Sequence, residues 1–217
     1  SIARKGAKTI NHLTYFKEYV YIIEPCAGLG VFIDELENYD FKNSKILGMD
    51  IIETPHPKIM TGDFLSLSSD DIARWRQSKT LVFGNPPFGR QSSMVRKFIK
   101  QASYFADTIA FILPKSFLKP SLHRTFPLHF HLLYSEQLPS DCFHLKNGKR
   151  HHVPCVFQIW RRKSEPRETP LVYQPCPYYQ FTNNITDADF SFRRVGVYAG
   201  QVSNVVNGKS LSSHYFV

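Results

Sequence analysis

The tetrapeptide Asn85-Pro86-Pro87-Phe88 combines residue types that can bind an amino group on a flat ring. It follows the apolar run 80–84, which predicts a buried strand, and its two prolines end that strand in a rigid turn. The Asn85 amide oxygen and the Pro86 carbonyl can accept two amine protons, and the Phe88 ring can stack on the flat face. On its own the tetrapeptide is equally typical of an ordinary turn, because Asn-Pro and Pro-Pro are common turn dipeptides.

A glycine-containing turn, which includes Gly28 and Gly30, follows a predicted strand over 19–24. Glycines between a strand and a helix let the backbone pass close to a ligand, although two glycines also suit any such turn. Asp50 lies twenty residues beyond Gly30 and ends the next predicted strand. A carboxylate at this position can accept both hydroxyl protons of a ribose, and the alternative is a turn or helix-capping aspartate.

A third motif, Gly62-Asp63-Phe64, follows a short predicted strand over 59–61. The Asp63 side chain and a neighbouring backbone N–H can bracket the amino group and a ring nitrogen of adenine, but alone the motif is more typical of a turn. All of these motifs end predicted strands, in chain order, at the same edge of one sheet. Their combination favours a ligand site far more than any one of them does.

The elements that position these residues alternate between strands and helices, which predicts a parallel sheet with crossover helices. No helix separates the last two predicted strands, 130–137 and 153–161, so we expect them to pair antiparallel. The expected fold is α/β: a Rossmann-like, seven-stranded, mostly parallel sheet with an antiparallel last strand. Predicted strands lie at 19–24, 45–50, 59–61, 81–83 and 108–113, and predicted helices at 31–39, 70–77 and 92–105.

The composition changes near residue 163, after which Pro, Asn, Tyr and Ser become frequent. We therefore expect a main domain over 1–163 and a short irregular or β-rich C-terminal extension over 164–217, which is too small for an independent domain. The chain lacks an initiator Met, so we expect it to be a trimmed fragment.

The chain is basic, with a net charge of +9 and an isoelectric point near 9.4. Basic proteins gain affinity for nucleic acid by displacing counterions from phosphates, although an ordinary solvated basic surface is the alternative. We expect the helix that carries Arg90, Arg96, Lys97 and Lys100 to be a solvated amphipathic face. The candidate nucleic-acid-binding residues are Lys146, Lys149, Arg150, His151 and His152 in one loop, and Arg193 and Arg194 in the extension.

The four cysteines form no Cys-x-x-Cys pair, which favours a reduced, intracellular protein. Cys142 and Cys155 do flank three histidines, but their spacing fits no familiar zinc finger, and we expect no metal. No stretch approaches the ~20 apolar residues of a membrane span, and the N-terminus lacks the apolar core of a signal peptide.

The four strand-end motifs together resemble those of class I S-adenosylmethionine-dependent methyltransferases. The resemblance covers roughly residues 19–161 and is closest to the adenine-N6 DNA methyltransferases, including those of restriction–modification systems. The first motif of that family ends Pro-x-x-Gly-x-Gly-x-Phe, which Pro25, Gly28, Gly30 and Phe32 match. The resemblance implies that 1–163 is the catalytic domain and that 164–217 contributes to substrate recognition.

The resemblance also implies roles for individual residues and S-adenosyl-L-methionine as the cofactor. Glu24, Cys26, Gly28 and Gly30 would surround the methionine portion of the cofactor. Asp50 would hold the ribose, with Ile51 against the adenine and Asp63 and Phe64 flanking it. Asn85 and Pro86 would hold the target amine in the rigid turn with Pro87, Phe88 would stack on its base, and Asn85 would also border the cofactor.

DNA is favoured over RNA as the partner, and the short extension implies a separate specificity segment or subunit. Tyr15 and Phe16 are the only candidates for the additional cofactor-binding segment that precedes strand one in many relatives. Such a protein would lie in the cytoplasm with the nucleoid in a prokaryotic or viral host, and in the nucleus of a eukaryote.

Three alternatives stay open. Related tetrapeptides occur in enzymes that methylate RNA bases and in enzymes that methylate a protein glutamine. A methyltransferase fold can also serve as a non-catalytic nucleic-acid-binding subunit, although the intact Asn85 and glycine turn favour an enzyme.

Overall fold

The computed structural model describes residues 2–14, 18–39, 44–139, 143–144, 150–168 and 177–217. The chain forms two compact units, Ser1–Thr169 and Pro170–Val217. Their division lies close to the predicted one between residues 163 and 164, and the roles assigned to the two parts remain predictions.

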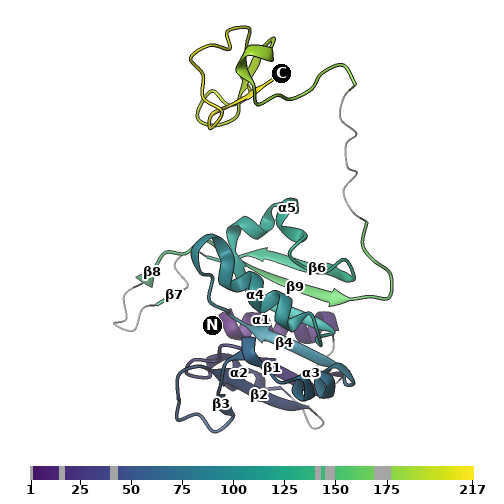
Figure 1. Ribbon diagram of the computed structural model, residues 1–217. Helices are drawn as coiled ribbons and strands as arrows, with labels where there is room; N and C mark the ends of the chain where they lie inside the picture. The colour runs from purple at the N-terminus through teal and green to yellow at the C-terminus, as the bar shows by residue number, and fades with distance from the viewer. Residues whose placement is uncertain (1, 15–17, 40–43, 140–142, 145–149, 169–176) are drawn as a thin grey trace. The chain divides into compact units, whose positions relative to one another are not determined.

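A seven-stranded sheet in the order β3-β2-β1-β4-β5-β9-β6 forms the centre of the first unit (Figure 1). The first five strands run parallel, whereas β9 pairs antiparallel with both β5 and β6. The expected Rossmann-like sheet with its antiparallel strand is confirmed. The strands are β1 (Tyr21–Glu24), β2 (Lys45–Asp50), β3 (Ile59–Thr61), β4 (Thr80–Gly84), β5 (Thr108–Pro114), β6 (Phe130–Gln137) and β9 (Cys155–Arg162).

Helices cover both faces of this sheet, because alternate residues of the central strands point to opposite sides. Ile23 and Val82 pack on one face with α3 and α4, whereas Ile22 and Leu81 pack on the other with α1 and α2. Figure 1 shows α4 in front of the sheet and α1 behind it. The helices are α1 (Ile2–Thr14), α2 (Val31–Glu37), α3 (Ser69–Arg76), α4 (Ser93–Ala102) and α5 (Pro120–His123), with short 3₁₀ turns η2 (Phe64–Ser66), η3 (Arg90–Ser92) and η4 (Lys115–Leu118).

Helix α1 is the element that the sequence prediction missed. Its buried residues include Ala3, Ala7, Ile10 and Thr14, a helical spacing that the intervening polar and basic residues obscure. This stripe packs on β4 and β9, and a Cβ atom on Gly6 would lie 3.4 Å from the Phe83 and Phe157 rings. None of the helices in the described ranges is long and apolar enough to cross a membrane.

Two smaller sheets complete the described chain. In the loop between β6 and β9, β7 (Phe143–His144) pairs with β8 (Arg150–His151). The second unit contains the 3₁₀ turn η5 (Ile185–Asp187) and a three-stranded antiparallel sheet in the order β11-β10-β12. Its strands are β10 (Ser191–Arg193), β11 (Val202–Ser203) and β12 (His214–Phe216).

Candidate functional site

The predicted site residues at the ends of β1, β2, β3 and β4 lie at one edge of the sheet. The parallel registers Ile23↔Val82, Glu24↔Gly48 and Asp50↔Thr61 align the carboxyl ends of these strands. This is the edge at which open α/β sheets bind their ligands. The common edge that the sequence predicted is therefore present.

Asn85 and Glu24 each bring a buried side-chain oxygen to this edge without a hydrogen-bond partner. The two atoms are Asn85 Oδ1 and Glu24 Oε2, and they are the only such atoms in the described part of the chain. Glu24 lies against Gly84, the residue before Asn85, since a Cβ atom on Gly84 would be 3.2 Å from Glu24 Cγ. Buried acceptors normally have donors, so this pair indicates a ligand that brings its own.

The Glu24 side chain is almost fully buried, with 2% of its surface exposed. Burial raises the pKa of this carboxyl well above its ordinary value, and the nearby Asp50 and Asp34 raise it further. A backbone hydrogen bond from Ile33 acts in the opposite direction and lowers the pKa. A cation placed beside it would favour the ionised form. The edge therefore suits a positively charged ligand.

Asp50 connects the end of β2 to the glycine turn. Its Oδ2 accepts the Gly28 N–H at 2.8 Å, and its Oδ1 accepts the Ile52 N–H at 2.9 Å. Each carboxylate oxygen keeps further acceptor capacity, so these bonds are compatible with the predicted ribose contact. The neighbouring Ile51, expected to lie against an adenine, is 73% exposed.

Asp63 caps the 3₁₀ turn η2, which is the turn role that the sequence also allowed. Its Oδ1 accepts the Leu65 N–H at 2.9 Å, and its Oδ2 accepts the Ser66 hydroxyl at 3.1 Å. The Phe64 ring is buried and stacks on Phe98 at 5.5 Å. Only the backbone of Phe64 is therefore available for the predicted contact with adenine.

Cys26 is half-buried at the start of the glycine turn. Burial raises the pKa of its thiol to about 12, and Asp50 and Glu24 add to the effect. The thiol therefore stays neutral at ordinary pH. This neutral, polarisable group suits packing against a ligand and does not suit a nucleophile.

His56, which the sequence did not single out, lies directly under the glycine turn. Its Nε2 is 3.2 Å from Asp34 Oδ1, and its Nδ1 accepts the Lys58 N–H at 3.2 Å. Gly30 has a φ of +84°, and a Cβ atom there would lie 2.7 Å from the His56 ring. Gly30 is therefore required both by its left-handed backbone and by its close approach to His56.

We expect Gly30→Ala to lower the free energy of unfolding by about 1–2 kcal/mol through the left-handed backbone alone, and further through the clash with His56. Gly28→Ala is the matched control, because Gly28 also has a positive φ of 53° but no neighbour within 4 Å. Denaturant unfolding of both variants measures the difference. Equal stabilities would show that the His56 contact does not constrain the turn.

Phe88 is half-buried and packs against both halves of the core. Its carbonyl accepts the Met94 N–H at 3.2 Å, which ties the tetrapeptide to the start of α4. Between the tetrapeptide and α4, Gln91 and Ser92 have positive φ values of 52° and 61°. Such strained backbone concentrates at functional sites, and no pattern in the sequence indicated it.

The predicted nucleic-acid-binding residues belong to the loop between β6 and β9 and to the second unit. In the second unit, Arg193 lies 5.7 Å from the Tyr198 ring and Arg194 lies 5.2 Å from the Tyr215 ring. His152 is exposed. Arg150 and His151 form β8, while Lys146, Lys149, Tyr15 and Phe16 lie outside the described residues.

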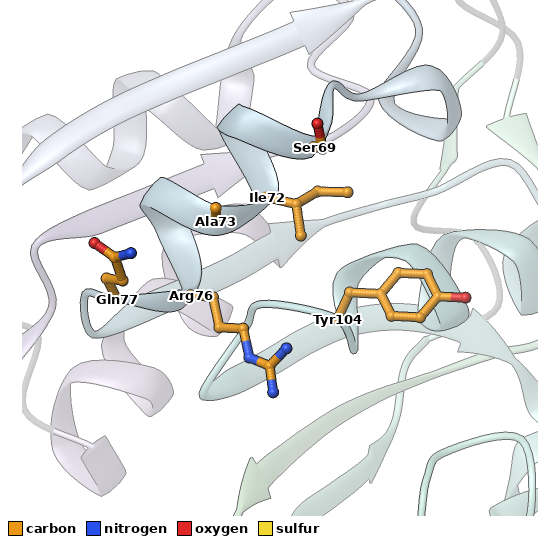
Figure 2. Close-up of a pocket in the computed structure, with 6 residues that line it drawn as sticks. All are labelled: Ser69, Ile72, Ala73, Arg76, Gln77 and Tyr104. Atoms are coloured by element: carbon orange, nitrogen blue, oxygen red, sulfur yellow. The ribbon is translucent and has the colours of Figure 1, made fainter.

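The described ranges contain no group of three His, Cys, Asp or Glu that could hold a metal ion. A cavity of about 660 Å³ lies on α3, and none of the predicted residues lines it (Figure 2). It is lined by Ser69, Ile72, Ala73, Arg76, Gln77 and Tyr104. Such an open surface cavity with one cation indicates no particular chemistry.

No protein-family model matches the chain, and no curated protein is similar to it in sequence. Solved structures do share its fold. A protein from Pyrococcus horikoshii, proposed to be an RNA methyltransferase, has a TM-score of 0.54 at 16% identity, over 74% of this chain and 84% of its own.

Two further structures are similar. A protein from Listeria monocytogenes, proposed to be a class I S-adenosylmethionine-dependent methyltransferase, has a TM-score of 0.53 at 14% identity, over 78% of this chain and 61% of its own. TrmN from Thermus thermophilus has a TM-score of 0.51 at 13% identity, over 72% of this chain and 48% of its own. These likenesses show that the chain has the Rossmann-like methyltransferase fold.

Proposed function

We propose that this protein transfers a methyl group from S-adenosyl-L-methionine to an exocyclic amine, with N6 of adenine in DNA as the first candidate. One observation carries the proposal. Two buried acceptors, Glu24 Oε2 and Asn85 Oδ1, stand at the ligand-binding edge of a methyltransferase fold and receive no hydrogen bond from any described residue. An ammonium group and an amine are the kinds of donor that would complete them.

The residues at this edge fit the cofactor. S-adenosyl-L-methionine carries an ammonium and a sulfonium. Asp50 supplies negative charge near the glycine turn, and Glu24 would ionise beside the bound ammonium. The exposed Ile51 offers an apolar surface for an adenine ring beside Asp50. Glu24, Cys26, Gly28 and Gly30 would hold the methionine portion, and Asp50 the ribose. When bound, the cofactor supplies a methyl group already activated by the sulfonium.

The chain's own part in the reaction is to hold and polarise the amine. The lone pair of an adenine amine is delocalised into the ring, so the amine is a poor nucleophile. Asn85 Oδ1 and the Pro86 carbonyl would accept its two protons, which draws electron density onto the nitrogen. Aligning amine and methyl group can contribute roughly 7–11 kcal/mol. The nitrogen becomes positively charged as the sulfonium leaves as a neutral thioether, so it would lose one proton to water and no strong general base is required.

The base must also leave its stack to reach a side chain whose acceptor atom is buried. Phe88 is half-buried beside Asn85, so part of its ring is available to stack on the base. The net charge of +9 favours a nucleic acid over a protein as the carrier of the amine.

The test is to incubate the protein with methyl-labelled cofactor and separate pools of double-stranded DNA, single-stranded DNA, RNA and protein. We expect label in DNA, recovered after digestion as N6-methyl-deoxyadenosine. Label in RNA alone would overturn the DNA assignment but keep an amine target. Label in protein alone would overturn the nucleic-acid assignment. Cofactor binding without transfer to any pool would favour a non-catalytic subunit.

A further inference from the structure

Positive charge is concentrated in the segment 72–135, which runs from α3 through β4, α4, β5 and α5 into β6. Residues 72–135 contain ten Lys and Arg but one acidic residue, Asp107. Residues 1–71 contain seven Lys and Arg against eleven Asp and Glu. The excess charge of the chain therefore belongs largely to one part of the first unit.

Three of these cations line a single cavity of about 410 Å³ between α4 and the end of α5. Arg96, Lys100 and Ser103 share one face of α4 and its C-terminal end, because they are four and three residues apart. None of the described residues that line the cavity is acidic. The lining residues are Arg96, Lys100, Ser103, Arg124, Thr125 and Pro127, and we call this cavity the α4–α5 groove.

The cations of the α4–α5 groove are available to bind an anion. Arg96, Lys100 and Arg124 are all exposed, and none of them takes part in the ion pairs found within the described ranges. An anion that enters the groove therefore does not have to displace a carboxylate. Three unpaired cations around one concavity give a stronger field than the same charges dispersed on a convex surface.

Two further arginines lie behind the groove and add to its positive field. Arg162 donates to the Ser103 carbonyl, and burial lowers its pKa; Asp107 opposes this shift, and Arg76 adds to it more weakly. Arg167 donates to four carbonyl oxygens at and beyond the end of α5, those of His123, Phe126, Pro127 and Phe130. These carbonyls would otherwise present negative partial charge beside the groove.

We propose that the α4–α5 groove binds the phosphodiester backbone of the nucleic acid whose base reaches Asn85. This inference rests on the proposed function and adds where the backbone is held. Helix α4 begins at Ser93, where the Met94 N–H bonds Phe88 O, and it ends at the groove, where Arg162 bonds Ser103 near the start of β6. One helix therefore connects the base site at the carboxyl edge of the sheet with the groove at the opposite edge. Its ten residues span roughly 15 Å, enough to follow several phosphates.

The shape of the groove favours a chain of phosphates over a flat anionic membrane. A membrane surface would meet cations that protrude from a convex face, whereas these three line a concavity. Phosphate contacts of this kind position a nucleic acid without reading its sequence. We therefore expect the groove to contribute affinity and salt dependence, and not base preference.

The test combines Arg96→Gln, Lys100→Gln and Arg124→Gln in one variant. A matched control, Lys8→Gln with Lys45→Gln and Lys58→Gln, removes the same charge from exposed positions on α1, β2 and the turn before β3. Binding is measured by fluorescence anisotropy with a labelled mixed-sequence DNA, single- and double-stranded, over a range of salt. Methyl transfer at saturating DNA and cofactor affinity are measured in parallel.

We expect the groove variant to bind DNA at least tenfold more weakly and to lose about two to three units of salt slope. Its cofactor affinity and its transfer rate at saturating DNA should equal those of the wild type. Equal losses in the control variant, or no loss in the groove variant, would overturn the groove proposal alone. Wild-type protein that neither binds nor methylates any nucleic acid would overturn the proposed function instead. Wild-type binding to phosphatidylserine vesicles but to no DNA would assign the groove to lipid and overturn the proposal.

Discussion

Replacing Asn85 with alanine is expected to lower the rate of methyl transfer by about 10²–10³-fold, the usual cost of removing one group that stabilises developing charge. Asn85 Oδ1 is buried and has no partner among the described residues, so its loss removes an acceptor that these residues leave unused. Single-turnover transfer at saturating substrate measures the effect. Cofactor affinity, measured by calorimetry, should change little.

The matched control is Asn38→Ala, which removes an exposed amide that hydrogen-bonds only locally, to backbone oxygens of α2. We expect this variant to keep full activity. Unchanged transfer in Asn85→Ala would remove this side chain from the mechanism. Loss of transfer together with loss of cofactor binding would instead make Asn85 part of the cofactor site alone.

Replacing Glu24 with glutamine is expected to weaken cofactor binding by roughly 10–150-fold. This factor corresponds to the loss of about 1.5–3 kcal/mol, the usual contribution of a hydrogen bond to a charged group. Binding of a cation beside Glu24 should also release a proton, because the pKa of the free carboxyl is raised. Calorimetry in buffers of different ionisation enthalpy measures that release, which should disappear in the variant. Wild-type affinity should rise with pH, while Glu37→Gln, at an exposed position of α2, should behave as the wild type.

The same carboxyl predicts how the stability of the free protein depends on pH. The pKa of Glu24 is higher in the folded than in the unfolded state. Folding therefore takes up a proton at pH values above the pKa of the unfolded state. The stability it provides is present below the unfolded pKa, near 4.5, and is lost as the pH rises through the folded pKa. Glu24→Gln should therefore be more stable than the wild type at high pH. A wild type whose unfolding free energy shows no such decline would contradict a protonated Glu24.

Short-range patterns in the sequence were enough to predict the sheet and the sheet edge that carries the site. Short apolar runs such as 80–84 and 108–113 are typical of strands buried on both faces, and glycine or proline turns mark where they end. Helices between successive strands then require parallel pairing. Strand ends that follow one another in such a sheet must meet at one edge, so Asp50 and Asn85 were placed together without any structural information.

Helix α1 and the role of His56 were not predictable in the same way. The apolar stripe of α1 is narrow, and only its packing on β4 and β9 distinguishes it from a polar tail. His56 lies in an irregular turn whose path is set by contacts with Asp34 and Gly30, more than twenty residues away. Local patterns carry no information about contacts of this kind.

By itself, the sequence determined the α/β class, the parallel sheet and the identity of its strand-end residues, because each follows from short-range periodicity and turn chemistry. The tertiary structure alone decided that Glu24 Oε2 and Asn85 Oδ1 have no donor among the described residues, and that Arg124 joins Arg96 and Lys100 around one groove. Sequence patterns report which residues are available. The burial of a side chain and its hydrogen-bond partners depend on which distant segments pack together. That packing is settled only when the whole sheet and its helices assemble.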